Sequence, residues 1–353
     1  MKRRALLLSL LAASAQADVR RGRALAFPRD HGAHTDTRTE WWYATGWLGS
    51  EAEPRYGFQL TFFRSRTGLA DGSASRFAAR QLLFAHAAVT DLGAQRHPHA
   101  QRIARWSGEG ASALADAANN DTGVRLAGWS LQRGGAGYRA QLPTDDFAID
   151  LALTPTQPLL LQGEAGFSRK GPDEHQASHY YSEPQLAVQG AVTLGGRRIE
   201  ASGRAWLDHE WSDEILHADA VGWDWIGINL FDGSALTAFR LRRADGSALW
   251  AGGSFRAAGQ ASTSFAPTDV RFTAGRSWRS PATQALYPVQ WQVETPAGRF
   301  EVRALMDAQE LDSRGSTGAI YWEGLAELRN TQGTRVGLGY LEMTGYNTRL
   351  KIG

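Results

Sequence analysis

Apolar side chains alternate with polar or small ones along most of this chain, and this period of two is its strongest structural signal. In "YGFQLTFFRSR", residues 56–66, every second side chain from Tyr56 to Phe62 is apolar. Because successive side chains of a strand point to opposite faces, the pattern predicts strands. Turn dipeptides such as Asp232-Gly233 separate these segments. The sequence therefore predicts an all-β fold of barrels or sandwiches, with helix expected only around residues 109–119.

An internal repeat indicates that one β-domain is present twice. "LTFFRSR" at residues 60–66 recurs as "LTAFRLR" at residues 236–242, with five identities in seven positions. Each copy is followed by "ADGSA" and preceded by an aromatic segment that contains an acid, "EWWYATGWL" in one case and "GWDWIGINL" in the other. Chance likeness between two hairpins is the alternative, but duplication explains the spacing better. We expect one domain over 18–200 and a second over 201–353.

The N-terminus has the features of a secretory signal peptide. Residues 1–17 contain a basic start, an apolar run and a final Ala-Gln-Ala triplet. We therefore expect an exported protein, periplasmic or secreted. The chain has no cysteine, so its stability must come from packing and not from disulfides. Its net charge of +2 gives no reason to expect a nucleic-acid partner. Peripheral contact with a membrane stays open, as does the oligomeric state.

The densest polar cluster is "AWLDHEWSDE", residues 205–214. In an extended chain Asp208 and Glu210 share one side, and His209 and Trp211 share the other. A histidine beside an apolar pocket can act as a general acid or base, because its proton exchanges near neutral pH. The alternative is a solvated turn between two strands. The position near the expected seam between the domains favours a site, since pockets often form at such seams.

Acids embedded in aromatic strands form the second group of candidates. Asp224 alternates with apolar residues, and Trp223 and Trp225 occupy the opposite face. An acid on an apolar face must be paired or protonated, and either state suits an acid catalyst. The alternative is an acid capped by an arginine. The same question applies to Glu40, Glu323 and Glu342.

Motifs for other chemistries are weak or missing. The sequence has no Gly-x-Ser-x-Gly elbow, phosphate-binding loop or dinucleotide fingerprint. Its closely spaced histidines, His97 with His99 and His175 with His179, have no convincing third ligand nearby. We therefore predict neither a metal site nor a cofactor. Thirteen tryptophans are typical either of an aromatic β core or of a pocket for an apolar small molecule.

Taken in order, several motifs resemble the AttH/carotenoid 1,2-hydratase-like family, whose members are often labelled predicted secreted hydrolases. They include "TEWWYATGWL", "YGFQLTFFR", "YYSEPQLAVQG", "AWLDHEWSDEIL", "GWDWIGINLFDG", "YWEGLAEL" and "GYLEMTGY", and the resemblance runs from about residue 27 to residue 346. The family implies two lipocalin-like antiparallel β-barrels in tandem and a pocket for a long apolar ligand, without a cofactor. Its characterised relatives hydrate a terminal isoprenoid double bond, and more distant ones catalyse pericyclic cyclisations.

The resemblance also implies a catalytic set. An Asp followed by His-x-Trp maps onto Asp208, His209 and Trp211, and Asp224 is the best match for a further acid. We predict that Asp208, His209 and Asp224 catalyse the reaction. The substrate-binding residues are predicted to be Glu40, Trp41, Trp42, Trp211, Trp223 and Trp225. Two alternatives stay open at this point, a carrier that binds an apolar ligand without changing it and a hydrolase.

Overall fold

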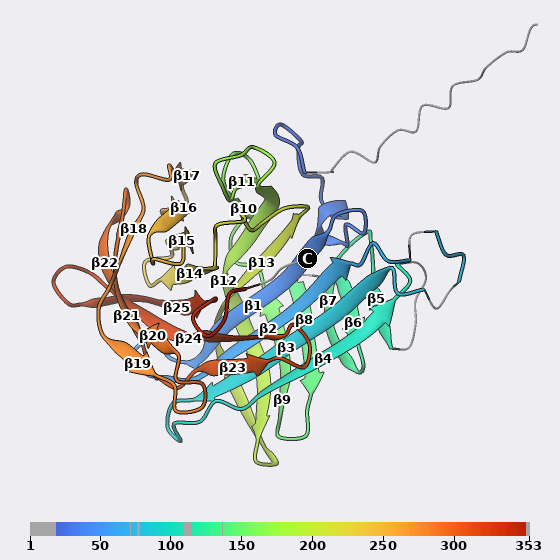
Figure 1. Ribbon diagram of the computed structural model, residues 1–353. Helices are drawn as coiled ribbons and strands as arrows, with labels where there is room; N and C mark the ends of the chain where they lie inside the picture. The colour runs from blue at the N-terminus through green and yellow to red at the C-terminus, as the bar shows by residue number, and fades with distance from the viewer. Residues whose placement is uncertain (1–18, 71, 76–77, 109–113, 136, 351–353) are drawn as a thin grey trace, which may run out of the picture.

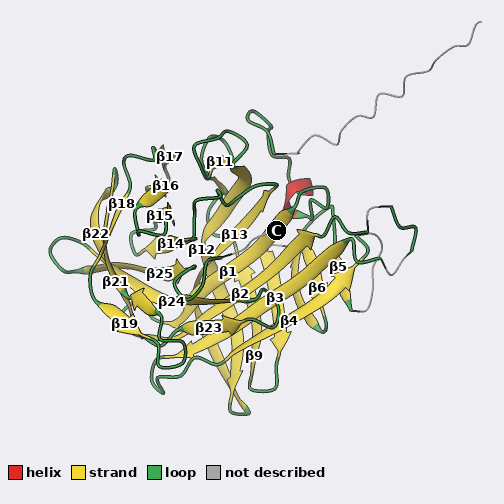
Figure 2. Ribbon diagram, in the orientation of Figure 1, coloured by secondary structure: helices red, strands yellow, loops and turns green. Residues whose placement is uncertain are grey.

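The computed structural model describes residues 19–70, 72–75, 78–108, 114–135 and 137–350. Strands make up nearly all of the regular structure in this part of the chain, and one short 3-10 helix, η1 (Arg29–His31), precedes the first strand (Figure 2). Residues 115–117, where a helix was expected, form a strand, and 109–113 lie outside the described residues. The predicted signal peptide also lies outside them. No helix among the described residues is long and apolar enough to cross a membrane.

The first sheet, sheet A, contains 13 strands within the described residues, in the order β4-β3-β2-β1-β13-β12-β9-β8-β7-β6-β5, with β10 and β11 also paired to β12 (Figure 1). Its end strand β4 contacts β5 and β6, so the sheet is nearly closed into a barrel. The bounds are β1 (Thr39–Gly49), β2 (Pro54–Arg66), β3 (Gln81–Asp91), β4 (His99–Trp106), β5 (Ala115–Ala117), β6 (Gly123–Leu126), β7 (Trp129–Gly134), β8 (Gly137–Pro143), β9 (Phe147–Thr154), β10 (Leu160–Leu161), β11 (Phe167–Arg169), β12 (Ala177–Leu194) and β13 (Arg197–Ser212).

The second sheet, sheet B, contains 10 strands within the described residues, in the order β17-β16-β15-β14-β25-β24-β22-β21-β18, with β23 paired to β24. The bounds are β14 (Gly222–Leu230), β15 (Ala235–Arg242), β16 (Ala248–Arg256), β17 (Ser262–Phe265), β18 (Arg271–Ala274), β21 (Gln290–Thr295), β22 (Gly298–Ala304), β23 (Glu310–Ser313), β24 (Ala319–Arg329) and β25 (Arg335–Met343). A separate two-stranded sheet joins β19 (Ser277–Arg279) to β20 (Leu286–Pro288).

The two large sheets share one strand order. In each, the first strand pairs with the second and also with the last, so that β1 lies between β2 and β13, and β14 lies between β15 and β25. The repeated heptapeptides occupy corresponding places in β2 and β15. Residues 201–212, which were predicted to begin the second domain, instead continue β13 and pair with β1 and β12 of sheet A. The chain passes from one sheet to the other between Ser212 and Gly222.

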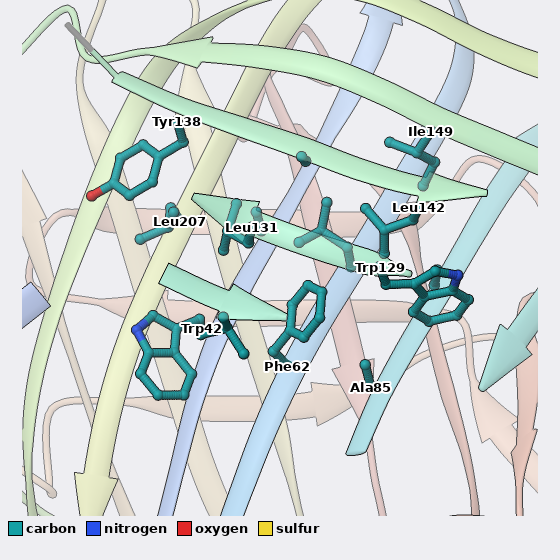
Figure 3. Packing of buried hydrophobic residues seen from close by; sticks show 14 of the residues in the cluster. Trp42, Phe62, Ala85, Trp129, Leu131, Tyr138, Leu142, Ile149 and Leu207 are labelled. Atoms are coloured by element: carbon teal, nitrogen blue, oxygen red, sulfur yellow. The ribbon is translucent and has the colours of Figure 1, made fainter. Parts of the chain in front are cut away.

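Alternating side chains build three large apolar clusters and a small fourth one within the described residues. The inward side chains of β1 and β2, such as Trp42 and Phe62, belong to one cluster inside the sheet A barrel with Trp129 and Leu142 (Figure 3). A second cluster consists mainly of side chains from the strands of sheet B. The third joins outward side chains of sheet A, including Tyr43, to residues of sheet B. Because each fully buried large apolar side chain contributes roughly 1.5–3 kcal/mol, this third cluster stabilises the packing of the two sheets.

Polar contacts also fix the position of the two sheets relative to each other. The Asn229 side-chain amide, on β14, donates to the Ala205 carbonyl on β13 at 3.0 Å. Its carbonyl oxygen accepts from the Gln185 backbone N–H at 2.8 Å. All three groups are buried. A paired polar group of this kind sets the register between packed surfaces, because moving it would leave buried donors and acceptors unsatisfied.

Candidate functional site

A cavity of about 360 Å³ lies between the two sheets. Its walls come from β1, β2, β3, β12 and β13 of sheet A, and from β14, β15, β24 and β25 of sheet B. Nine aromatic side chains line it, from Trp41, Tyr43, Phe63, Phe84, Tyr180, Trp223, Trp225, Phe239 and Tyr321. An apolar cavity with a few polar groups is the usual form of a small-molecule site.

Asp208 is the best-positioned acid in this wall. Its Oδ1 accepts hydrogen bonds from the Ser182 hydroxyl at 2.5 Å and the Trp206 indole N–H at 2.7 Å, and its Oδ2 accepts from the Tyr180 hydroxyl at 2.8 Å. Burial raises the pKa of Asp208 to about 7, against the lowering effect of these bonds. Near neutral pH the carboxyl group therefore exchanges its proton readily, which suits a general acid or base.

Lys170 and Glu210 form an ion pair beside Asp208. The Lys170 ammonium lies 2.9 Å from Glu210, and above the rings of Tyr180 and Phe239 at 4.7 Å and 4.4 Å. Lys170 reaches the cavity from the segment between β11 and β12. No motif in the sequence connects it with Asp208, so it was missed. Tyr180 was also missed, although alternation along "YYSEP" could have placed it with Ser182 on one face.

Two further acids lie on sheet B, directly opposite each other. Glu323 of β24 and Glu342 of β25 are register partners, and both line the cavity. Burial raises the pKa of Glu342 to about 7, and burial together with the charge of Glu342 holds the pKa of Glu323 well above its usual range. The Tyr43 and Tyr321 hydroxyls interact with the Glu323 carboxyl group. Within the described residues, the Tyr43 hydroxyl and the enclosed Glu323 Oε1 make no hydrogen bond of ordinary geometry.

His209 lies on the opposite face of β13 from Asp208, as the alternation predicted, inside the sheet A barrel. Its Nε2 lies 2.9 Å from Glu40 Oε1, and its ring stacks on Trp42 with centroids 4.7 Å apart. Burial lowers the pKa of His209, although Glu40 opposes this effect. The histidine that was predicted as a catalytic acid or base therefore lies away from the wall that carries Asp208.

Glu40 is the centre of this buried network. Its Oε2 accepts from the Arg64 Nε at 2.7 Å, and its Oε1 lies 2.7 Å from His34 Nδ1. His34, Glu40 and His209 present ligand atoms within 4.8 Å of one another, which is a spacing that a metal ion could use. Because Arg64 already neutralises the carboxylate, we interpret the group as a hydrogen-bonded network that orders the barrel. The carboxylate–arginine pair holds the pKa of Glu40 well below its usual range, although burial opposes the shift.

Asp224 repeats the arrangement of Glu40 in sheet B. Glu40 faces Arg64 across β1 and β2, and Asp224 faces Arg240 across β14 and β15. The Asp224 carboxylate lies 2.7 Å from Arg240 and 3.1 Å from Arg242. The Tyr346 hydroxyl donates to it at 2.8 Å. This is the arginine-capped alternative of the sequence analysis. The structure does not bring Asp224 together with Asp208, and its predicted catalytic role stays a prediction.

The predicted site residues thus divide between three places. Asp208, Glu40, Trp41, Trp223 and Trp225 line the cavity between the sheets. His209, Trp42 and Trp211 pack inside the sheet A barrel, and Asp224 lies within sheet B. The predicted cluster "AWLDHEWSDE" is largely the end of β13 and not a solvated turn, since Asp208 to Ser212 are buried. Gly227 helps to shape the wall, because a Cβ there would collide with the Trp225 ring.

Comparison with known structures identifies proteins that share this architecture. A crystal structure of an AttH-type protein from Nitrosomonas europaea is 48% identical, with a TM-score of 0.85, and the match covers 93% of this chain and 99% of that one. Kievitone hydratase from Nectria haematococca is 15% identical, with a TM-score of 0.66 and coverage of 92% and 94%. The structure of CghA is 12% identical, with a TM-score of 0.51 and coverage of 88% and 89%. The last two likenesses show the fold alone.

No curated protein matches the sequence. The model of the family described as AttH-like matches residues 18–346, nearly the whole described chain. This match and the 48% identical structure agree with the motifs from which the resemblance was first drawn. The lipocalin-like all-β fold that the resemblance implied is confirmed. The chain belongs to the AttH-like family.

Proposed function

We propose that this protein adds water across a carbon–carbon double bond of an apolar, isoprenoid-like ligand held between the two sheets, with Asp208 as the proton donor. The observation that carries the proposal is the position of Asp208. It is a buried carboxyl group in the wall of an aromatic cavity, and three hydrogen bonds fix its orientation. A pKa raised to about 7 keeps much of this carboxyl group protonated at neutral pH.

The reaction balances with one acid and one water. The Asp208 O–H bond breaks and its proton forms a C–H bond at the less substituted alkene carbon, which leaves a tertiary carbocation. The faces of Trp41, Trp223 and Trp225 are able to stabilise this cation. A water oxygen then bonds to the cationic carbon, and the proton that it loses returns to the Asp208 carboxylate. The net change is alkene plus water to a tertiary alcohol, and no cofactor takes part.

The comparisons support the proposal through the fold. A hydratase shares the architecture at a TM-score of 0.66. We do not transfer its substrate, since 15% identity shows the fold alone. The signal peptide predicted at residues 1–17 leads us to propose that the reaction takes place outside the cytoplasm. Cell fractionation of the full chain, with detection in the periplasm or medium, tests that location.

The experiment incubates the full chain with a panel of isoprenoids that carry a terminal trisubstituted double bond, in water labelled with oxygen-18. Mass spectrometry of the products should show the uptake of one labelled water. Asp208→Asn should abolish the uptake, and Asp219→Asn, which removes an exposed carboxylate, should not change it. Equal turnover by wild type and Asp208→Asn would refute the assignment.

The carrier alternative has a distinct outcome in the same experiment. The aromatic cavity also suits a protein that binds an apolar ligand without changing it. Native mass spectrometry after mild extraction would then show a bound ligand that is recovered unaltered from both wild type and Asp208→Asn. A cyclisation would give an isomer without labelled oxygen, and a hydrolysis would give two fragments.

A further inference from the structure

We infer that the cavity between the sheets binds organic cations, such as an ammonium group carried on an apolar chain, with Glu323 and Glu342 as the anionic partners. This inference goes beyond the proposed hydration, because it requires binding and no turnover. It rests on an imbalance of charged groups around the cavity, on two carboxyl groups that lie opposite each other in its wall, and on the aromatic walls.

The acids of the cavity outnumber its cations. Among the described residues, Lys170 is paired with Glu210, and Arg64 is paired with Glu40. No lysine or arginine of the described chain forms an ion pair with Asp208, Glu323 or Glu342, although all three line the cavity. A buried acid normally has a cationic partner or keeps its proton. A ligand with a positive charge would supply the missing partner.

Glu323 is the most deeply buried of these three acids, at 1% exposed. The Tyr43 and Tyr321 hydroxyls interact with its carboxyl group, and its enclosed Oε1 makes no hydrogen bond of ordinary geometry within the described residues. Glu342 lies directly opposite on β25, so two carboxyl groups converge on the same part of the cavity. Two carboxyl groups without a cationic partner in a buried wall favour a ligand that carries a positive charge.

The aromatic walls suit a cation as well as an apolar chain. Lys170 already demonstrates this, since its ammonium lies over the rings of Tyr180 and Phe239 within the same wall. Trp223 and Trp225 border the space near the acids. Indole faces attract cations, most strongly when water is excluded. The same cavity is therefore lined both by aromatic ring faces and by a pair of carboxyl groups.

Protonation of the acids competes with binding of the cation. Burial raises the pKa of Glu342 to about 7 and that of Glu323 well above its usual range, so binding should strengthen as the pH rises. The other titratable groups that face these acids are Tyr43, His86, Lys170, Tyr180, Asp208, Glu210, Tyr321 and Tyr340. Burial keeps the four phenols neutral by raising their pKa values, and it keeps the histidine neutral by lowering its pKa to about 3. Burial raises the pKa of Asp208 to about 7, so this acid also gains charge as the pH rises.

The test measures binding to the full chain by isothermal titration calorimetry, with octyltrimethylammonium, 1-octanol and octyl sulfate as probes of similar length. At pH 8 we expect the cation to bind at least tenfold more tightly than the alcohol, and the anion to bind least. The affinity for the cation should fall at pH 6, while that for the alcohol should not change. Equal affinities for cation and alcohol in the wild type would overturn the inference, without any variant being needed.

Variants locate the site. The double change Glu323→Gln and Glu342→Gln should reduce the affinity for the cation at least tenfold and leave 1-octanol binding unchanged. Glu327→Gln is the matched control, because Glu327 also belongs to β24 but pairs with Arg329 and Arg335 and does not line the cavity. Undiminished binding of the cation to the double variant would mean that the cation binds at another site, and this would refute the assignment. Binding without uptake of labelled water would support this inference and count against the proposed hydration.

Discussion

Replacement of Asp208 by asparagine should make the protein more stable at pH 8, although it removes the proposed acid. The pKa of Asp208 rises from 3.8 to about 7 on folding, and one pKa unit corresponds to about 1.36 kcal/mol, so the ionised carboxylate destabilises the fold by about 4 kcal/mol. The folded state binds the proton more tightly, so this penalty grows as the pH rises from about 4 and is complete above about 7.

Asparagine has nearly the same shape and no charge. Its Oδ1 can still accept from Ser182 and Trp206, but its amide can no longer accept from the Tyr180 hydroxyl. Loss of one such hydrogen bond costs about 1 kcal/mol. The net expectation is a gain of roughly 3 kcal/mol at pH 8.5 and a small loss at pH 4.5.

Urea unfolding of wild type and variant at both pH values measures this difference. Glu210→Gln is the informative comparison, because it leaves the Lys170 ammonium without its partner at 2.9 Å and should be destabilising. A stability difference between Asp208→Asn and wild type that does not change with pH would refute the reasoning. So would a variant that is less stable at pH 8.5.

Three further substitutions separate structure from binding. Arg64→Met leaves the buried Glu40 carboxylate without its guanidinium and should reduce the free energy of unfolding by about 3–5 kcal/mol, measured in urea. Asp224→Asn should cost a similar amount by depriving Arg240 of its carboxylate. The affinity of Asp224→Asn for 1-octanol, measured by calorimetry, should be unchanged. A large loss of affinity would contradict the placement of Asp224 outside the cavity. Trp223→Ala should weaken 1-octanol binding about tenfold, because it removes apolar wall from the cavity, and circular dichroism should show the fold intact.

The sequence predicted the faces of single strands well. The period of two correctly separated Trp42 from Trp41 and Tyr43 on β1, and His209 from Asp208 on β13. These are local consequences of extended backbone, so one segment contains the whole signal. The duplication likewise anticipated that Glu40 and Asp224 occupy corresponding places.

Long-range neighbours could not be read from the sequence. Glu40 and His209 lie 169 positions apart, and only the pairing of β1 with β13 brings them into one network. Lys170 reaches Glu210 from a connecting segment without periodic pattern. The acid pair Glu323 and Glu342 was noticed, but its place in the cavity depends on how sheet B packs against sheet A. A sequence pattern shows which face a side chain takes and not what lies opposite it.

The pairing of the first strand with the last strand in sheet A has a consequence for biosynthesis. Thr39 pairs with Ser212, 173 residues later in the chain. At a synthesis rate of about 5–20 residues per second, the aromatic edge of β1 waits roughly 10–35 s for its partner. During this time an unpaired hydrophobic strand is exposed, which is a known route to aggregation. Since β2 pairs with the opposite edge of β1, the edge that receives β13 stays unpaired until β13 has been synthesised.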